Sequence, residues 1–123
     1  MKIDLKRYSK MIKEKEDIAF LAYQIPLHTK QLFITKIFYG NISILFSELC
    51  SMLDGIEYRV KHDAFEEAIE LIDETTSFIK KYDEFDTYQK KESEEDIEAF
   101  LPSDILDMLQ DLKEKIDRFL KES

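Results

Sequence analysis

The chain has 123 residues, of which 37% are charged and 44% hydrophobic, and its net charge is −9 at neutral pH. This length fits one domain with one modest core, expected to span 1–123. The composition is too apolar for a disordered chain and too charged for a membrane protein, and two glycines and two prolines are too few for the turns of an all-β fold.

The apolar residues form no run that would span a membrane. The most apolar stretch, residues 32–46, is interrupted by Lys36, Gly40 and Asn41 and falls short of the roughly 20 residues that a spanning helix requires. The first residues also lack the apolar core of a secretory signal. We therefore expect a cytoplasmic protein that does not bind a membrane. The single cysteine, Cys50, has apolar neighbours, which predict a buried thiol.

The charges are distributed unevenly along the chain. Residues 1–36 carry a net charge of +4, whereas residues 63–104 carry −11. Because the acidic part would repel phosphates, nucleic acid is not expected as a ligand. The asymmetry suits either the first helix lying against the third within one molecule, or an acidic face presented to a basic partner.

Apolar residues at helical spacing predict an all-α, single-domain bundle of four to five helices, the first over about 4–24. Its apolar positions recur three, four or seven residues apart, and Pro26 is expected to end it. These positions are Leu5, Tyr8, Ile12, Ala19 and Ala22.

A second helix is predicted over 29–60, with a kink near Gly40. Its apolar face consists of Ile34, Phe38, Leu45, Leu49, Met52, Ile56 and Val60. The β-branched residues of this region and the Gly40-Asn41 pair leave an alternative open, an α+β fold with a hairpin over 31–46.

Residues 63–81 predict a third helix. Asp63 and Glu66 are spaced as a capping box, in which each side chain accepts a hydrogen bond from the other residue's backbone amide. Acids follow in the first turns and Lys80 and Lys81 lie at the end, as the helix dipole favours. The buried face is expected to consist of Phe65, Ala68, Ile69, Ile72, Thr76 and Ile79.

The rest of the chain predicts a loop and two more helices. Residues 82–93 have no clear period and are expected to form a loop, followed by a short helix over 94–100. Pro102 breaks the chain, and Ser103 can cap a last helix over 104–121. Apolar residues at four-three spacing predict a seam, which either packs into the bundle or joins two copies in a homodimer. They are Ile105, Leu109, Leu112, Ile116 and Phe119.

Two stretches carry a resemblance to known helical proteins. DAFEEAIELIDE (63–74) and LPSDILDMLQ (101–110) resemble an uncharacterised family of small bacterial all-helical proteins, over about residues 42–112. Phe65 followed by Ala68 also resembles the second helix of a tetratricopeptide-type hairpin, in which the small residue lets two helices approach. The resemblance implies a helical hairpin and supplies no activity.

Four carboxylates raise an enzymatic alternative. Asp54-x-x-Glu57 and Glu70-x-x-Asp73 resemble the paired acids of magnesium-dependent all-helical nucleotide pyrophosphohydrolases, although the first position has Asp where that family has Glu. At 100° per residue the four acids lie beside the apolar stripes of their helices, which is typical of a solvated face. The sequence therefore favours a protein with no catalytic residue, metal or other cofactor, and keeps this magnesium site as the alternative.

The aromatic and acidic residues after the third helix are the candidates for binding a partner. They either fold back over the bundle or form an exposed binding surface, and they are Tyr82, Asp83, Glu84, Phe85, Asp86 and Tyr88. Small acidic immunity proteins and antitoxins resemble this chain in size and charge. The expected function is a non-enzymatic protein-interaction module that inhibits or protects a basic partner protein. An alternative is a secretion or assembly chaperone that binds an apolar helix in the groove between the second and third helices.

Overall fold

The computed structural model describes residues 4–35, 41–88 and 102–122. Its long helices are α1 (Leu5–Thr35), α2 (Asn41–Lys61), α3 (Phe65–Lys81) and α5 (Pro102–Glu122), and residues 83–88 form a short helical segment. The described residues contain no strand, so the all-α bundle is confirmed. The hairpin over 31–46 is wrong, because residues 41–46 lie in α2.

Two expectations fall partly or wholly outside the described residues. The predicted helix over 94–100 lies outside them. Gly40, where the predicted helix over 29–60 was expected to kink, also lies outside them, and the described residues of that predicted helix belong to two helices, 29–35 to α1 and 41–60 to α2. Within the described residues, no helix is both long enough and apolar enough to cross a membrane.

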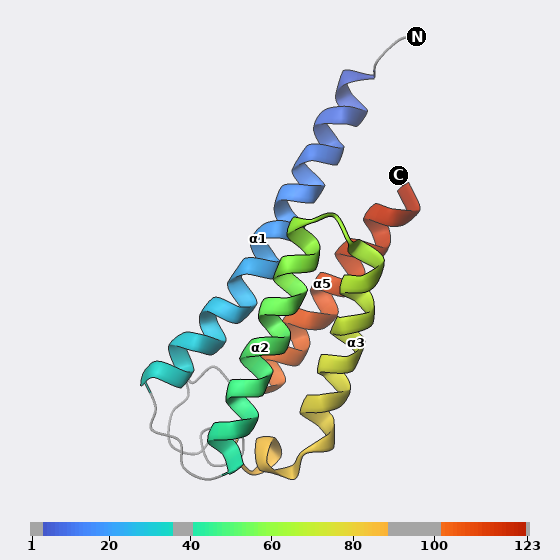
Figure 1. Cartoon of the computed structure of the whole chain (residues 1–123). Coiled ribbons are helices and arrows are strands. Elements are labelled where there is room, and N and C mark those ends of the chain that lie inside the picture. The colour runs from blue at the N-terminus through green and yellow to red at the C-terminus, as the bar shows by residue number, and fades with distance from the viewer. Residues whose placement is uncertain (1–3, 36–40, 89–101, 123) are drawn as a thin grey trace.

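The four long helices form a ring in which each helix packs on two neighbours (Figure 1). α1 packs on α2 and α5, and α3 packs on the same two helices from the other side. Within the described residues α1 and α3 make no contact, so the expectation that the basic first helix lies against the acidic third is wrong. The two oppositely charged helices instead occupy opposite edges of the bundle.

The core follows the helical spacing of apolar residues most closely in α5. All five residues of the predicted seam are buried within the chain, so the seam packs into the bundle. Pro102 begins this helix, where its missing amide does no harm, and Ser103 lies inside the helix, not at its cap as expected. In α3 four residues of the predicted face are buried, namely Phe65, Ala68, Ile72 and Ile79. Ile69 and Thr76 are only half-buried, and Thr75 is buried instead.

α1 continues through Pro26, where the sequence predicted its end. A proline inside a helix removes one backbone hydrogen bond and costs about 3 kcal/mol. Pro26 and its neighbour Ile25 are buried, and the hydroxyl of the buried Thr29 donates to the carbonyl of Ile25 at 2.9 Å. We infer that the packing of this turn against the bundle offsets the cost of the proline.

The predicted buried face of α1 is also wrong along most of its length. Leu5, Tyr8 and Ile12 are exposed, whereas Ile18, Ala22 and Ile25 form the buried face. These buried residues also recur at helical spacing, and spacing alone does not tell which apolar face meets the bundle.

Asp63 ends α2 and does not cap α3. Its φ is 58°, in the left-handed region, its amide donates to the carbonyl of Val60 at 3.1 Å, and the amide of Ala64 donates to the carbonyl of Arg59 at 2.8 Å. These two bonds form a Schellman motif, which satisfies the last carbonyls of α2. Ala64 precedes α3 without a side-chain cap, so the predicted capping box is wrong.

Candidate functional site

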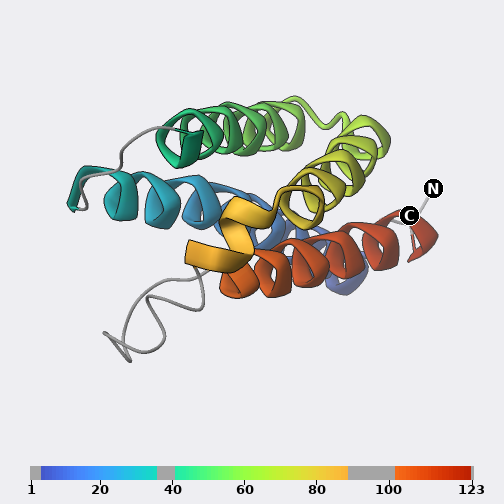
Figure 2. The same cartoon turned by 90° about the horizontal axis from the view of Figure 1, so that it is seen from below.

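The predicted partner-binding residues lie where α3 ends and the chain turns across the end of the bundle. The backbone leaves the helix at Tyr82, which is extended, and residues 83–88 then form a helical turn and a half in place of the expected loop. Figure 2 shows this segment lying across the ends of the long helices. The position follows from a cluster of aromatic rings beneath it.

The aromatic side chains of this segment belong to the core. Phe85 is 1% exposed, and its ring centroid lies 5.3 Å from that of Phe46 on α2 and 5.7 Å from that of Phe78 on α3. The ring of Tyr88 also meets Phe46, at 5.2 Å. Of the two expected arrangements, the aromatics therefore fold back over the bundle, and Phe85 is not an exposed anchor for a partner.

The acids of the segment face the other way. Asp83 and Asp86 are exposed and Glu84 is half-buried, while the half-buried ring of Tyr82 packs on Phe78 with 5.1 Å between centroids. The six predicted residues thus separate into carboxylates on the surface and rings that hold the segment in place.

A cleft opens beside these acids. It has a volume of about 390 Å³ and lies between the end of α3, the segment 83–88 and the start of α5. Its walls are Ile79, Lys80, Tyr82, Asp83, Phe85, Asp86, Pro102, Ser103 and Leu106. Four of the six predicted residues therefore border one concave surface with mixed apolar and charged walls.

The outer side of α3 extends the negative surface. Its five acids are exposed, and they are Glu66, Glu67, Glu70, Asp73 and Glu74. Asp73 pairs with Lys113 of α5 at 2.8 Å, and this hydrogen bond raises the pKa of Lys113. Within the described residues the four glutamates form no ion pair. We call these four glutamates the acidic face.

The four carboxylates of the magnesium alternative are not brought together. Asp54 bonds Lys30 of α1 at 2.7 Å, which raises the pKa of that lysine, and Asp73 bonds Lys113. In the described part of the chain, which includes Asp54, Glu57, Glu70 and Asp73, no three histidine, cysteine or acidic side chains are placed to hold a metal ion. The expected resemblance to pyrophosphohydrolases therefore does not extend to their site.

Cys50 is half-buried and not fully buried as expected. Burial raises the pKa of its thiol, and the nearby carboxylate of Asp54 raises it further. A thiol with a raised pKa is protonated at neutral pH and is a poor nucleophile.

The groove expected between the second and third helices is filled beside Gly55. A side chain at Gly55 of α2 would meet the Cδ2 atom of Leu71 of α3 at 2.9 Å. The absence of a side chain at Gly55 therefore lets α3 pack tightly, and this place leaves no room for a partner's helix.

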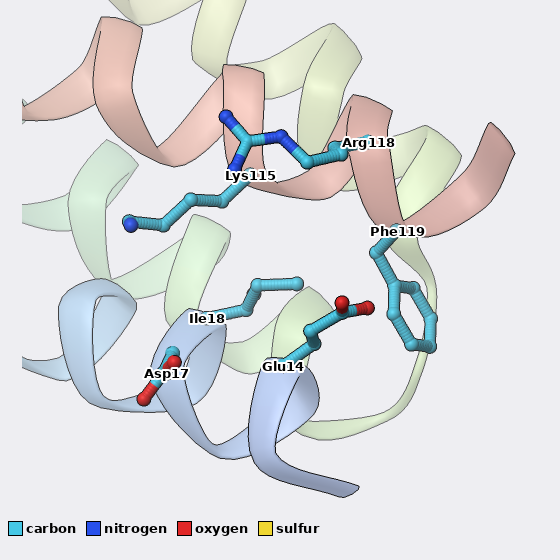
Figure 3. Close-up of a pocket in the computed structure, with 6 residues that line it drawn as sticks. All are labelled: Glu14, Asp17, Ile18, Lys115, Arg118 and Phe119. Carbon is cyan, nitrogen blue, oxygen red and sulfur yellow. The ribbon is translucent and has the colours of Figure 1, made fainter. Parts of the chain in front are cut away.

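Two hollows lie between α1 and α5 instead. The smaller, of about 70 Å³, has Glu14 and Asp17 from α1 on one wall and Lys115 and Arg118 from α5 on the other (Figure 3). The larger, of about 340 Å³, lies toward the start of α1 and shares Glu14 and Phe119 with the first. Acids and cations alternate in both, so neither has the single sign of charge that would select an ionic ligand.

Comparisons with protein families, curated proteins and solved structures found no match for this chain.

Proposed function

We propose that this chain is a non-enzymatic protein-interaction module that binds and inhibits, or protects, a basic partner protein, in the manner of small immunity proteins and antitoxins. The observation that supports this most is the acidic face, four exposed glutamates on consecutive turns of α3 that the described residues leave without a counter-charge. Charge of one sign on one side of a protein attracts an oppositely charged partner and raises the rate of encounter.

The end of the same edge supplies a place for specific contacts. The cleft of about 390 Å³ combines the apolar walls of Ile79 and Leu106 with the carboxylates of Asp83 and Asp86. Interfaces gain most of their affinity from a few side chains seated in such hollows, surrounded by polar contacts. The exposed Lys80 and Lys81 follow the acidic face at the end of α3 and precede these two aspartates, so the partner would meet two groups of acids.

Inhibition follows from the chemistry of such a partner. A basic surface on an enzyme commonly binds substrates that carry phosphate groups, and carboxylates compete for the same cations. A module that covers this surface would exclude the substrate without any chemistry of its own.

The test is retention of a partner on the immobilised chain. Proteins from native lysate would be bound at low salt and eluted with increasing salt, and the most abundant stoichiometric protein identified by mass. The variant Glu66→Gln/Glu70→Gln/Glu74→Gln should release it at clearly lower salt, because three attractive charges are lost.

A matched control makes the same change of net charge on other helices. Glu16→Gln, Glu48→Gln and Asp107→Asn replace exposed acids on three other helices. This control should release the partner at the salt concentration of the wild type. Equal release from the wild type and the α3 variant, or equal loss in variant and control, would contradict the proposal.

A further inference from the structure

The first turns of α1 extend beyond α2 and α3 (Figure 1). Lys15 pairs with Asp63, in the turn between α2 and α3, at 3.1 Å, so the residues before Lys15 lie past the ends of those two helices. The last turn of α5 lies along one side, where Glu122 accepts a hydrogen bond from Arg7 and pairs with Lys10. We call residues 5–13 the overhang.

The overhang exposes three large apolar side chains that the fold does not use. Leu5 is 72% exposed, Tyr8 57% and Ile12 41%. At 100° per residue they lie within an arc of about 60°, on one side of the helix. Separations of three and seven residues are the anchor pattern of an amphipathic helix that inserts into an apolar groove.

Charge and preorganisation complete this pattern. The overhang contains four cations and no acid, namely Lys6, Arg7, Lys10 and Lys13. The carboxylate of Asp4 accepts the amides of Lys6 and Arg7 at 3.1 and 3.2 Å, so the helix is capped before any partner arrives. A helix that is already formed loses little conformational entropy when it binds.

The charges decide which occupant fits. Two overhangs packed together would place eight cations, four from each chain, in one interface, and such like charges repel. An anionic lipid surface faces the whole molecule, whose net charge of −9 opposes its approach. A protein groove meets the overhang alone, and carboxylates at its rim would be attracted to its cations, of which Lys10 already pairs with Glu14 and Glu122.

We propose that the overhang inserts into an apolar groove with an acidic rim on a partner protein, with Leu5, Tyr8 and Ile12 as its anchors. This surface lies on α1, diagonal to the acidic face on α3, and the inference does not rest on the proposed function. The two surfaces would let one chain hold two partners of opposite charge at once.

The test uses a defined acidic groove as its probe. The isolated C-terminal lobe of calcium-loaded calmodulin opens an apolar, methionine-rich groove that takes basic amphipathic helices of many sequences. The full chain should bind this lobe saturably in calorimetry, and binding should vanish when calcium is chelated and the groove closes. Tyr8→Ala/Ile12→Ala should weaken it by about tenfold or more, since two of the three anchors are removed.

The matched control is Ile44→Ala/Tyr58→Ala, which removes the same two residue types from exposed positions on α2. It should bind as the wild type does, and both variants should keep the wild-type unfolding midpoint because none of these side chains is buried. Absence of saturable binding, or equal weakening in variant and control, would overturn the proposal.

Two further measurements test the other occupants. Vesicles of equal parts phosphatidylcholine and phosphatidylserine should not sediment the chain, and light scattering should give the mass of one chain. Sedimentation with vesicles that Tyr8→Ala/Ile12→Ala abolishes would assign the overhang to lipid, and a dimer that this variant dissolves would assign it to a second copy. Either result would overturn the protein groove.

Discussion

The ring of Phe85 meets the ring of Phe46 edge to face, with 5.3 Å between their centroids, and both side chains are fully buried. This contact joins the segment 83–88 to α2 and holds Asp83 and Asp86 on the surface. The sequence grouped Phe85 with the partner-binding residues, but the geometry makes it the residue that positions them.

Phe85→Ala should therefore act on stability. Removing a buried phenylalanine costs about 3–5 kcal/mol through lost burial and the cavity left behind. Denaturant unfolding would measure this loss, with Asp83→Ala, at an exposed position, as a control that changes stability by less than about 0.5 kcal/mol. A loss below about 1 kcal/mol for Phe85→Ala would mean that the ring is not part of the core.

The backbone of Asp63 leads to a second prediction. Its φ of 58° is favourable only for glycine and is tolerated by aspartate and asparagine. Asp63→Gly should raise the free energy of unfolding by about 0.5–1 kcal/mol, less a small loss from the exposed ion pair with Lys15.

Asp63→Val is the opposing variant, because a β-branched side chain is strained at positive φ. It should lower the free energy of unfolding by about 1–2 kcal/mol in the same urea titration. If the capping box were present after all, Asp63→Gly and Asp63→Val would both destabilise the protein, and Glu66→Ala would do so as well.

Cys50 gives a prediction about pH. Burial first, and the carboxylate of Asp54 second, raise the pKa of its thiol, so the folded state favours the protonated form. This preference stabilises the fold below the pKa of the unfolded thiol and is lost as the pH rises through the higher folded pKa. At mildly alkaline pH the thiol should react with iodoacetamide more slowly than a cysteine in a short peptide.

Asp54→Asn tests the cause. Removing the carboxylate removes one of the two influences that raise the pKa of Cys50, so alkylation should become faster than in the wild type at the same pH. An unchanged rate would show that burial alone protects the thiol, and a wild-type rate equal to that of the peptide would show that Cys50 is not protected.

The sequence correctly predicted the buried residues of helices that have a single apolar stripe, because only one face of such a helix can pack into the core. The seam of α5 from Ile105 to Phe119 has a single apolar stripe, and every one of its residues lies in the core. α1 has two apolar stripes, one that contains Ile12 and one that contains Ile18. Which of them is buried depends on where the neighbouring helices α2 and α5 end. The helix end predicted at Pro26 was wrong for a related reason, because tertiary packing outweighed the local preference of proline against a helix interior.

The sequence named the residues of the candidate site but did not predict which of their side chains are exposed and which are buried. Asp83 and Asp86 are exposed as a binding surface requires, whereas the loss of period after Tyr82 concealed a short helix whose rings turn inward. Rings at 78, 82, 85 and 88 are separated by three or four residues, and this helical spacing was the signal that the charged residues between them obscured. The pairing of Asp54 with Lys30 and of Asp73 with Lys113 depends on contacts between helices that spacing within one helix does not reveal.

The most direct test of the acidic face is the association rate constant for the purified partner, measured by stopped flow at low and high salt. We predict a decrease of about tenfold or more between roughly 0.05 and 0.5 M salt for the wild type, with little change in the dissociation rate constant. For Glu66→Gln/Glu70→Gln/Glu74→Gln we predict a slower rate at low salt and a much weaker dependence. An association rate constant that is independent of salt, or one that the variant leaves unchanged, would contradict the binding of a basic partner at the acidic face.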